Sequence, residues 1–199
     1  AAELLAHLES VGVEVRRCVA GVEEYGTLLR VTGPAAGFAA VVRYAAGLAA
    51  GLGRPRPWPA CDPARVASAV AAASAAAEPL RALAADGRLA GPTTFLASGA
   101  YAGLVENLRA KLLEGPLVPA PAVWDLLDVA HGPFQQAFTA AATFVVLTRP
   151  DAPREAELVT RLESMLDPSR HRLVRAAATL PFPWCVFEHE ALVNELALA

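Results

Sequence analysis

The sequence predicts an α/β fold, in which helices cover both faces of a parallel sheet to form a three-layer α-β-α sandwich. The prediction comes from the stretch between Thr93 and Arg149, where short apolar runs alternate with a helical period. The apolar runs cover Thr93–Ala97, Ala122–Leu127 and Ala142–Thr148, and the helical pattern covers Tyr101–Glu114. Short apolar runs bounded by glycine and proline, with a helix between them, are typical of βαβ units.

The residues before this stretch predict a second, incomplete α/β segment. Its expected elements are a helix, an alternating strand, a short strand and a helix rich in alanine and glycine, at Ala2–Ser10, Val13–Val19, Thr27–Thr32 and Ala35–Leu52. A first domain therefore covers residues 1–53.

A proline-rich linker over residues 54–61 separates this domain from the rest, because Arg54–Pro59 cannot be helical. The second domain, residues 62–199, opens with a predicted helical hairpin over Asp62–Ala85. Asp62 is its expected N-cap, and Pro63 stands at the first helical position. Its closing elements are a helix, a strand and a last helix, at Arg154–Leu166, His171–Ala177 and Phe187–Ala199.

Composition narrows the class of protein. The chain has 199 residues, 55% of them hydrophobic and 19% charged, so we expect a globular protein with a substantial core. A net charge of −3 gives no reason to expect nucleic acid or an anionic membrane as a partner. No apolar run is long enough to span a bilayer, and the start lacks the pattern of a signal peptide.

The cysteines indicate the compartment. Cys18, Cys61 and Cys185 are odd in number, scattered and without metal-ligand spacing. Buried thiols in a reducing cytoplasm are therefore expected, with no metal and no cofactor.

Two turns point to a ligand site. In parallel sheets, ligands bind beyond the carboxyl ends of the strands, where loops enter helices. Ser98–Gly99 follows the first apolar run, and His131-Gly132-Pro133 follows the second. We therefore expect a small flexible turn and a titratable side chain on the same edge of the sheet.

The central stretch resembles the sugar isomerase (SIS) domain family, above all the second SIS lobe of two-lobed phosphosugar isomerases. These include the isomerase part of glucosamine-6-phosphate synthase and the fructosamine-phosphate deglycases. The resemblance is carried by Ser98-Gly99, Lys111-Leu112-Leu113-Glu114, Val118-Pro119-Ala120, and Asp128 three residues before His131-Gly132-Pro133. It implies an SIS-type fold, with one nearly complete lobe and a partial first lobe.

The resemblance also implies a function, aldose–ketose isomerase or deglycase chemistry on a sugar phosphate or amino-sugar derivative. Glu114 would move a proton between C1 and C2, and His131 would help to open the sugar ring. The implied substrate-binding residues are Ser98, Gly99, Ala100, Lys111 and Asp128. In the family this histidine often crosses a dimer interface.

Some positions depart from the family pattern. Asn107 stands where the family has a further glutamate, and the phosphate-binding Ser-x-Ser-Gly-x-Thr turn of the first lobe is missing. Residues 1–53 resemble only the later half of a first lobe. We therefore expect the chain to be part of a longer protein, and the alternative is a member that has lost the phosphate turn.

Other interpretations remain open. Glu114 can be a surface carboxylate at a helix end, Lys111 a solvated helix-face residue, and Asp128 and His131 structural residues of a turn. At the level of function, the alternatives are a non-catalytic sugar-phosphate-binding or regulatory module and an amino-sugar deaminase or lyase.

A homodimer is expected through the helices of Ala35–Leu52 and Asp62–Ala85. The first segment is dense in alanine and glycine and the second in alanine, which suits close helix contacts.

Overall fold

The computed structural model describes residues 2–12, 14, 32–114, 119, 121–137 and 139–199. It divides into two compact units, Ala1–Pro55 and Arg56–Ala199. The assignment of residues 1–53 to a partial SIS lobe, and of 54–61 to a linker, stays a prediction. Among the described residues, none of the helices is long and apolar enough to cross a membrane.

The first unit contains two described helices, α1 (Ala2–Ser10) and α2 (Thr32–Gly51). The strands predicted at 13–19 and 27–32 lie almost entirely outside the described residues, and Thr32 already belongs to α2. The prediction that α2 begins at Ala35 was wrong by one turn. Gly33 and Pro34 belong to its first turn, where proline is tolerated because no backbone donor is required there.

Exposed apolar side chains lie along one side of α2. Val41, Tyr44 and Leu48 are all more than half exposed and recur at helical spacing. In the second unit, the predicted hairpin helices α3 (Pro63–Ala75) and α4 (Glu78–Ala85) pack against α8 (Cys185–Leu198). A dimer through these helices stays a prediction.

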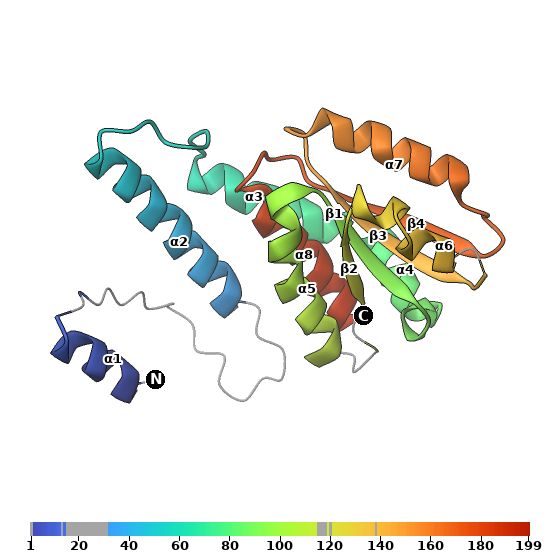
Figure 1. Ribbon diagram of the computed structural model, residues 1–199, viewed down its shortest axis with the longest axis horizontal. Coiled ribbons are helices and arrows are strands. Elements are labelled where there is room, and N and C mark those ends of the chain that lie inside the picture. Colours follow the sequence, from blue (N-terminus) through green and yellow to red (C-terminus); the bar gives the residue numbers. More distant parts are fainter. Residues whose placement is uncertain (1, 13, 15–31, 115–118, 120, 138) are drawn as a thin grey trace. The chain divides into compact units, whose positions relative to one another are not determined.

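The second unit is built on a four-stranded parallel sheet, as predicted (Figure 1). Its strands are β1 (Thr93–Ala97), β2 (Ala122–Asp125), β3 (Ala142–Thr148) and β4 (His171–Ala177), in the order β2-β1-β3-β4. The prediction that β2 continues to Leu127 was wrong. The strand ends at Asp125, whose carboxylate accepts a hydrogen bond from the Leu127 amide at 2.8 Å and turns the chain.

Helices flank the sheet on both faces. α5 (Ala102–Glu114) and α8 pack together on one face, and α6 (Pro133–Ala137) and α7 (Pro153–Met165) lie on the other (Figure 1). Three short 3-10 turns connect elements, at Arg88–Ala90, Gly99–Tyr101 and Asp128–Ala130. Asp62 caps α3 as predicted, accepting from the Ala64 amide at 3.0 Å.

The alternation of side chains along the central strands divides the core between the two faces. Leu96, Phe144 and Val146 point toward α6 and α7, where they pack in one cluster with Phe134, Val159 and Leu162. The intervening residues, such as Phe95 and Val145, are fully buried and face the opposite layer. The sheet is therefore covered on both faces, as parallel sheets require.

Helix α8 is buried on nearly all sides, because α3, α4 and α5 surround it and β4 lies beneath it. Its polar side chains consequently have partners inside the unit. Glu188 accepts hydrogen bonds from the backbone amides of Thr179 and Leu180, each at 2.8 Å. A helix of this kind must satisfy every buried polar group that it carries.

The strand order creates a crevice at the carboxyl edge of the sheet. The chain leaves β1 toward β2 on one side, and it leaves β3 toward β4 on the other. Loops that diverge in this way open a space between the carboxyl ends of β1 and β3, which is where open α/β sheets bind their ligands.

Candidate functional site

A pocket of about 500 Å³ lies at this crevice. The turn after β1 contributes Ser98 and Gly99, the end of β2 contributes Asp125 and Leu127, and the start of α7 contributes the remaining wall. Three separate elements therefore converge on one cavity, which we call the carboxyl-edge pocket. Its volume is in the range of small-molecule sites.

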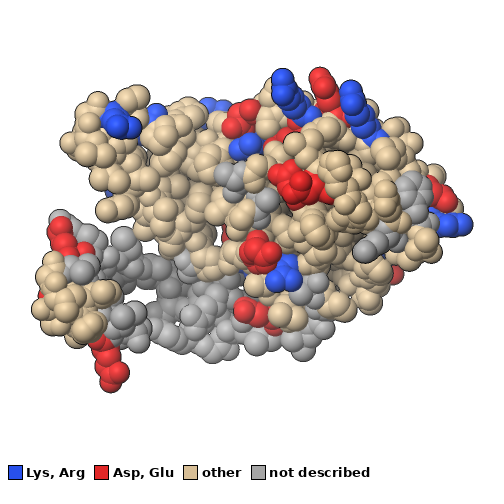
Figure 2. Space-filling view, in the orientation of Figure 1, with Lys and Arg blue, Asp and Glu red and all other residues tan. Residues whose placement is uncertain are grey.

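The rim of the carboxyl-edge pocket carries exposed charges of both signs. Arg154, Glu157 and Arg161 belong to its lining and are exposed on α7. Side chains of both signs project over this helix (Figure 2). Because water surrounds these groups, their interactions are weakened by solvent and by salt.

The Gly99 turn is folded around an internal carboxylate. Gly99 adopts φ +58°, a left-handed conformation that glycine adopts without strain. Its amide donates to one oxygen of Asp125 at 2.7 Å, while the other oxygen accepts from the Leu127 amide. This amide of a predicted substrate-binding residue therefore already has an acidic partner.

A second carboxylate holds the Ser98 hydroxyl. Ser98 donates to Oε1 of Glu155, and the Arg149 guanidinium lies 3.4 Å from the same oxygen. Glu155 is only 5% exposed. Its other oxygen, Oε2, is buried without a hydrogen-bond partner in the described part of the chain. A buried acceptor without a donor is unusual in a folded protein.

The sequence did not identify Asp125, Arg149 or Glu155 as site residues. Asp125 and Glu155 lie 26 and 57 positions from the turn that they contact. The available signal was their position, since Asp125 lies near the carboxyl end of one predicted strand and Glu155 follows another. Position alone does not specify which backbone donors they bind.

Beneath the turn, Tyr101 and His189 form a buried pair. The His189 Nε2 lies 2.9 Å from the Ala176 carbonyl and 3.1 Å from the Thr148 carbonyl, so this nitrogen carries the proton. Its Nδ1 then accepts from the Tyr101 hydroxyl. The pair ties the start of α5 to α8 and to the ends of β3 and β4.

Burial shifts the pKa values of the side chains in this cluster. Loss of solvation lowers the pKa of His189 to about 4, raises the pKa of Tyr101, and raises the pKa of the Cys185 thiol to about 12. Cys185 is buried as predicted, whereas Cys61 is only partly buried. Arg149 lies over the Tyr101 ring at 5.9 Å from its centroid, and so adds a cation–π contact to the cluster.

The His189 environment predicts a stability that depends on pH. The native state keeps His189 neutral down to about pH 4, whereas the unfolded state binds this proton near pH 6.5. The free energy of unfolding therefore has its full value above pH 6.5. It decreases as the pH falls to about 4, by at most about 3 kcal/mol. Urea unfolding between pH 4.5 and 7.5 measures this decrease.

His189→Gln should flatten this pH dependence, and His7→Gln should not, because His7 is exposed on α1. An unchanged slope in His189→Gln would contradict the assignment of a neutral buried imidazole.

Lys111 lies in the interior, 3% exposed, so the interpretation as a solvated helix-face lysine was wrong. Its ammonium donates to the Glu190 carboxylate and to Oδ1 of Asn194 at 2.7 Å. Asn107 also donates to Glu190, at 2.6 Å. A glutamate at position 107, as in the family pattern, would instead place two carboxylates together. Substrate binding by Lys111 stays a prediction.

Glu114 lies at the far end of the unit from the Ser98–Gly99 turn. It is the last residue of α5 and is exposed. Because β1 and β2 are parallel, α5 runs back along the sheet, and its 13 residues extend about 20 Å. The structure therefore does not bring Glu114 together with the carboxyl-edge pocket of its own chain.

The His-Gly-Pro segment does not line the carboxyl-edge pocket, and Pro133 instead lines a second cavity near the amino ends of the strands. Asp128 and His131 follow β2 and are exposed, and the Asp128 carbonyl accepts from the His131 amide at 2.9 Å. The carboxylate that accepts from backbone amides at the end of β2 is that of Asp125. Ala100 lies in the 3-10 turn Gly99–Tyr101. Of the predicted residues, Ser98 and Gly99 line the carboxyl-edge pocket, whereas Lys111 and Glu114 lie on α5 and Asp128 and His131 lie outside the pocket lining.

The described residues give no centre for a metal. Among them, no three histidine, cysteine, aspartate or glutamate side chains are placed to hold an ion. The adjacent Glu188, His189 and Glu190 point to three different partners.

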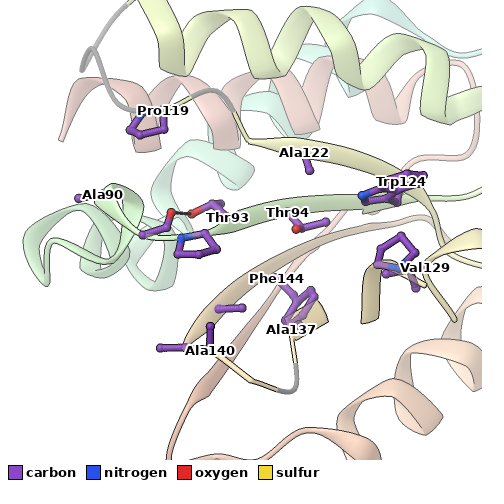
Figure 3. Close-up of a pocket in the computed structure, with 15 residues that line it drawn as sticks. Ala90, Thr93, Thr94, Pro119, Ala122, Trp124, Val129, Ala137, Ala140 and Phe144 are labelled. Carbon is purple, nitrogen blue, oxygen red and sulfur yellow. Dashed lines mark hydrogen bonds between the residues drawn. The ribbon is translucent and has the colours of Figure 1, made fainter. Parts of the chain in front are cut away.

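A second cavity, of about 590 Å³, lies near the amino ends of the strands (Figure 3). Its walls are mostly alanine and proline carbon atoms, with the rings of Trp124 and Phe144, and no residue of its lining is ionisable. Thr93 donates to the Gly91 carbonyl at 3.3 Å. Because the lining of the second cavity carries no ionisable side chain, the carboxyl-edge pocket is the better candidate site.

No family model and no curated protein sequence matches the chain. It is similar to a solved structure of a protein from Salmonella typhimurium LT2 assigned as sugar binding, with 18% identity and a TM-score of 0.49. It is also similar to the C-terminal domain of glucosamine-fructose-6-phosphate aminotransferase from Francisella tularensis, with 13% identity and a TM-score of 0.45.

These similarities cover 68% and 67% of this chain but only 46% and 43% of the two structures. The chain therefore spans less than half the length of either. The two similarities assign no role to any residue of this chain.

Proposed function

We propose that this chain is an SIS-type module that binds a phosphosugar or a related sugar derivative at the carboxyl-edge pocket. The observation that supports the proposal is the convergence of the Ser98–Gly99 turn, the end of β2 and α7 on one pocket at the carboxyl edge of a parallel sheet. The order of the sequence motifs along the chain agrees with the resemblance to the SIS family.

The proposed chemistry is aldose–ketose isomerisation or deglycation. Exchange between C1 and C2 needs a carboxylate base near the acidic carbon and a group that transfers protons near neutral pH. Glu114 is proposed as the base and His131 as the group that opens the ring. Both are exposed and can reach a ligand without breaking a buried contact.

The geometry supports a site shared between two copies. Within one chain, Glu114 is the last residue of α5, whereas His131 follows β2 after a 3-10 turn. A site that uses both would take the carboxyl-edge pocket with His131 from one copy and Glu114 from another. This arrangement agrees with the predicted homodimer.

One specific observation favours a second candidate, a non-catalytic sugar-phosphate-binding module. Lys111 is paired inside the unit, and Glu114 is remote from the pocket of its own chain. A chain with these features can bind a ligand at the carboxyl edge without performing proton transfer.

Both candidate functions require that the chain bind a sugar phosphate. Ligand-induced thermal stabilisation of the full chain tests this binding. Glucose 6-phosphate, fructose 6-phosphate and glucosamine 6-phosphate are compared with glucose and with inorganic phosphate. A ligand at 100 times its dissociation constant stabilises by about 2.7 kcal/mol, which corresponds to roughly 5–10 °C in Tm. If no sugar phosphate raises Tm above the two controls, the proposal is wrong.

Gly99→Val should abolish this stabilisation by the bound ligand. Valine is disfavoured at φ +58°, so the turn must change its conformation and the pocket with it. Gly103→Ala is the control, because Gly103 lies exposed within α5 and alanine favours helix. Equal ligand-induced shifts in both variants would place the ligand elsewhere.

A further inference from the structure

The second cavity, near the amino ends of the strands, is separate from the carboxyl-edge pocket and shares no lining residue with it. We infer that the second cavity is a binding site for an uncharged ligand with an aromatic ring. The inference goes beyond the proposed function and does not depend on it.

One face of the sheet forms the floor of this cavity. Thr94 of β1 is in register with Ala122 of β2 and with Phe144 of β3, so the three side chains form a row across neighbouring strands. Trp124 follows two positions along β2 and therefore lies on the same face. Helix α6 covers part of this face and begins at Pro133, which also lines the cavity. The volume of about 590 Å³ is in the range of small-molecule sites.

The chemistry of the lining excludes a charged ligand. Among the described residues of the lining, none is ionisable, and most contribute only carbon atoms. A charged ligand would lose part of its hydration shell in this cavity without gaining a group of opposite charge, which is costly. The ligand that fits is therefore uncharged.

Aromatic rings form part of the lining. Trp124 and Phe144 project into the cavity from β2 and β3 (Figure 3). Phe144 is 2% exposed, whereas Trp124 is 42% exposed, so much of the indole ring remains open to a ligand. An aromatic ligand buries a large apolar area and gains offset-stacked or edge-to-face contacts with such rings. An aromatic ring is therefore the group that this lining favours.

Two polar groups in the lining are available to orient a ligand. The Thr94 hydroxyl and the Trp124 indole nitrogen have no hydrogen-bond partner in the described part of the chain. The neighbouring Thr93 differs, since its hydroxyl donates to the Gly91 carbonyl at 3.3 Å. A few polar groups in an otherwise apolar lining are typical of small-molecule sites, where they fix the orientation of the ligand.

The size of the lining favours a small molecule over a protein. The lining consists of 15 described residues (Figure 3). A stable protein–protein interface takes about 20–30 residues on each side. The cavity is thus large enough to enclose a small ligand and too small to hold a protein partner by itself.

Equilibrium dialysis of the full chain at pH 8 tests the inference with three probes that share one bicyclic ring. Quinoline is uncharged at this pH, whereas N-methylquinolinium is a cation and quinoline-6-carboxylate is an anion. Quinoline should bind at least 10-fold more tightly than either charged probe, because only the charged probes lose favourable hydration. Equal binding of the three probes would overturn the inference.

Two variants change the cavity in opposite ways. Ala122 is exposed on β2, so Ala122→Phe fills the cavity without breaking a buried contact and should abolish quinoline binding. Trp124→Ala removes the exposed ring and should weaken binding about 10-fold. Leu113→Ala is the control. It removes an exposed apolar side chain of α5 that lies outside the lining, and should bind quinoline as the parent protein does.

A measurement on the parent protein covers the case in which a variant does not fold. Nuclear Overhauser effects should connect the quinoline protons to the indole ring of Trp124. Parental binding in both folded variants, or effects that reach only residues outside the lining, would overturn the inference. If quinoline binds as expected but no sugar phosphate stabilises the chain, only the proposed function fails. If sugar phosphates stabilise the chain but quinoline does not bind, only this inference fails.

Discussion

Lys111→Met is expected to lower the free energy of unfolding by about 3–5 kcal/mol. The substitution keeps the length of the side chain but removes the ammonium that binds Glu190 and Asn194. The side chains of Lys111 and Glu190 are 3% and 9% exposed, so the carboxylate would remain buried without its cation. Urea unfolding at pH 7 measures the loss.

Two further variants test whether the loss of stability comes from leaving a buried charge without its partner. Arg109→Met breaks the exposed pair of Arg109 and Glu106, and should cost less than about 1 kcal/mol. The double variant Lys111→Met with Glu190→Met should recover more than half of the loss, because apolar replacement of a whole buried pair is often neutral or stabilising. If Lys111→Met costs no more than Arg109→Met, the pair is not buried in solution.

The fold could be predicted from local patterns because the strands of this sheet are short, apolar and bounded by turns. β1, β3 and β4 have the predicted limits, at Thr93–Ala97, Ala142–Thr148 and His171–Ala177. β2 was predicted too long, since apolar Leu126 and Leu127 continue its pattern. The side chain of Asp125 ends it by bonding to backbone amides, a competition that hydrophobic periodicity does not reveal.

The site was predicted only in part, for a physical reason. Strand ends are visible in the sequence, so the Ser98–Gly99 turn was placed on the correct edge. The carboxylates that fill its donors come from other elements, and local patterns carry no information about such distant contacts.

The buried position of Lys111 was missed for a related reason, since Glu190 is 79 positions away. One signal was available in the last helix. It carries apolar residues on all sides and is therefore expected to be buried. Acids in a buried helix need partners, and a lysine on a neighbouring helix is a natural one.

Glu114→Gln is expected to reduce turnover of fructose 6-phosphate about 100- to 10,000-fold while leaving ligand binding nearly unchanged, if the chain is an isomerase. Glutamine keeps the shape of the side chain and removes its ability to accept a proton. His131→Asn should cost less, and should affect cyclic substrates more than open-chain ones, because only cyclic sugars need ring opening. Parental turnover in Glu114→Gln would show that the family role does not apply to this residue.

Mixing these two variants decides whether the site is shared between copies. Refolding Glu114→Gln and His131→Asn together in equal amounts gives a population in which half of the dimers are mixed. In a mixed dimer, one site has both defects, and the other combines an intact Glu114 with an intact His131. Activity should therefore rise to about a quarter of the parental value on cyclic substrates, provided that each variant alone is nearly inactive on them. A mixture no more active than the mean of the two variants would place both residues in the same copy and would contradict a shared site.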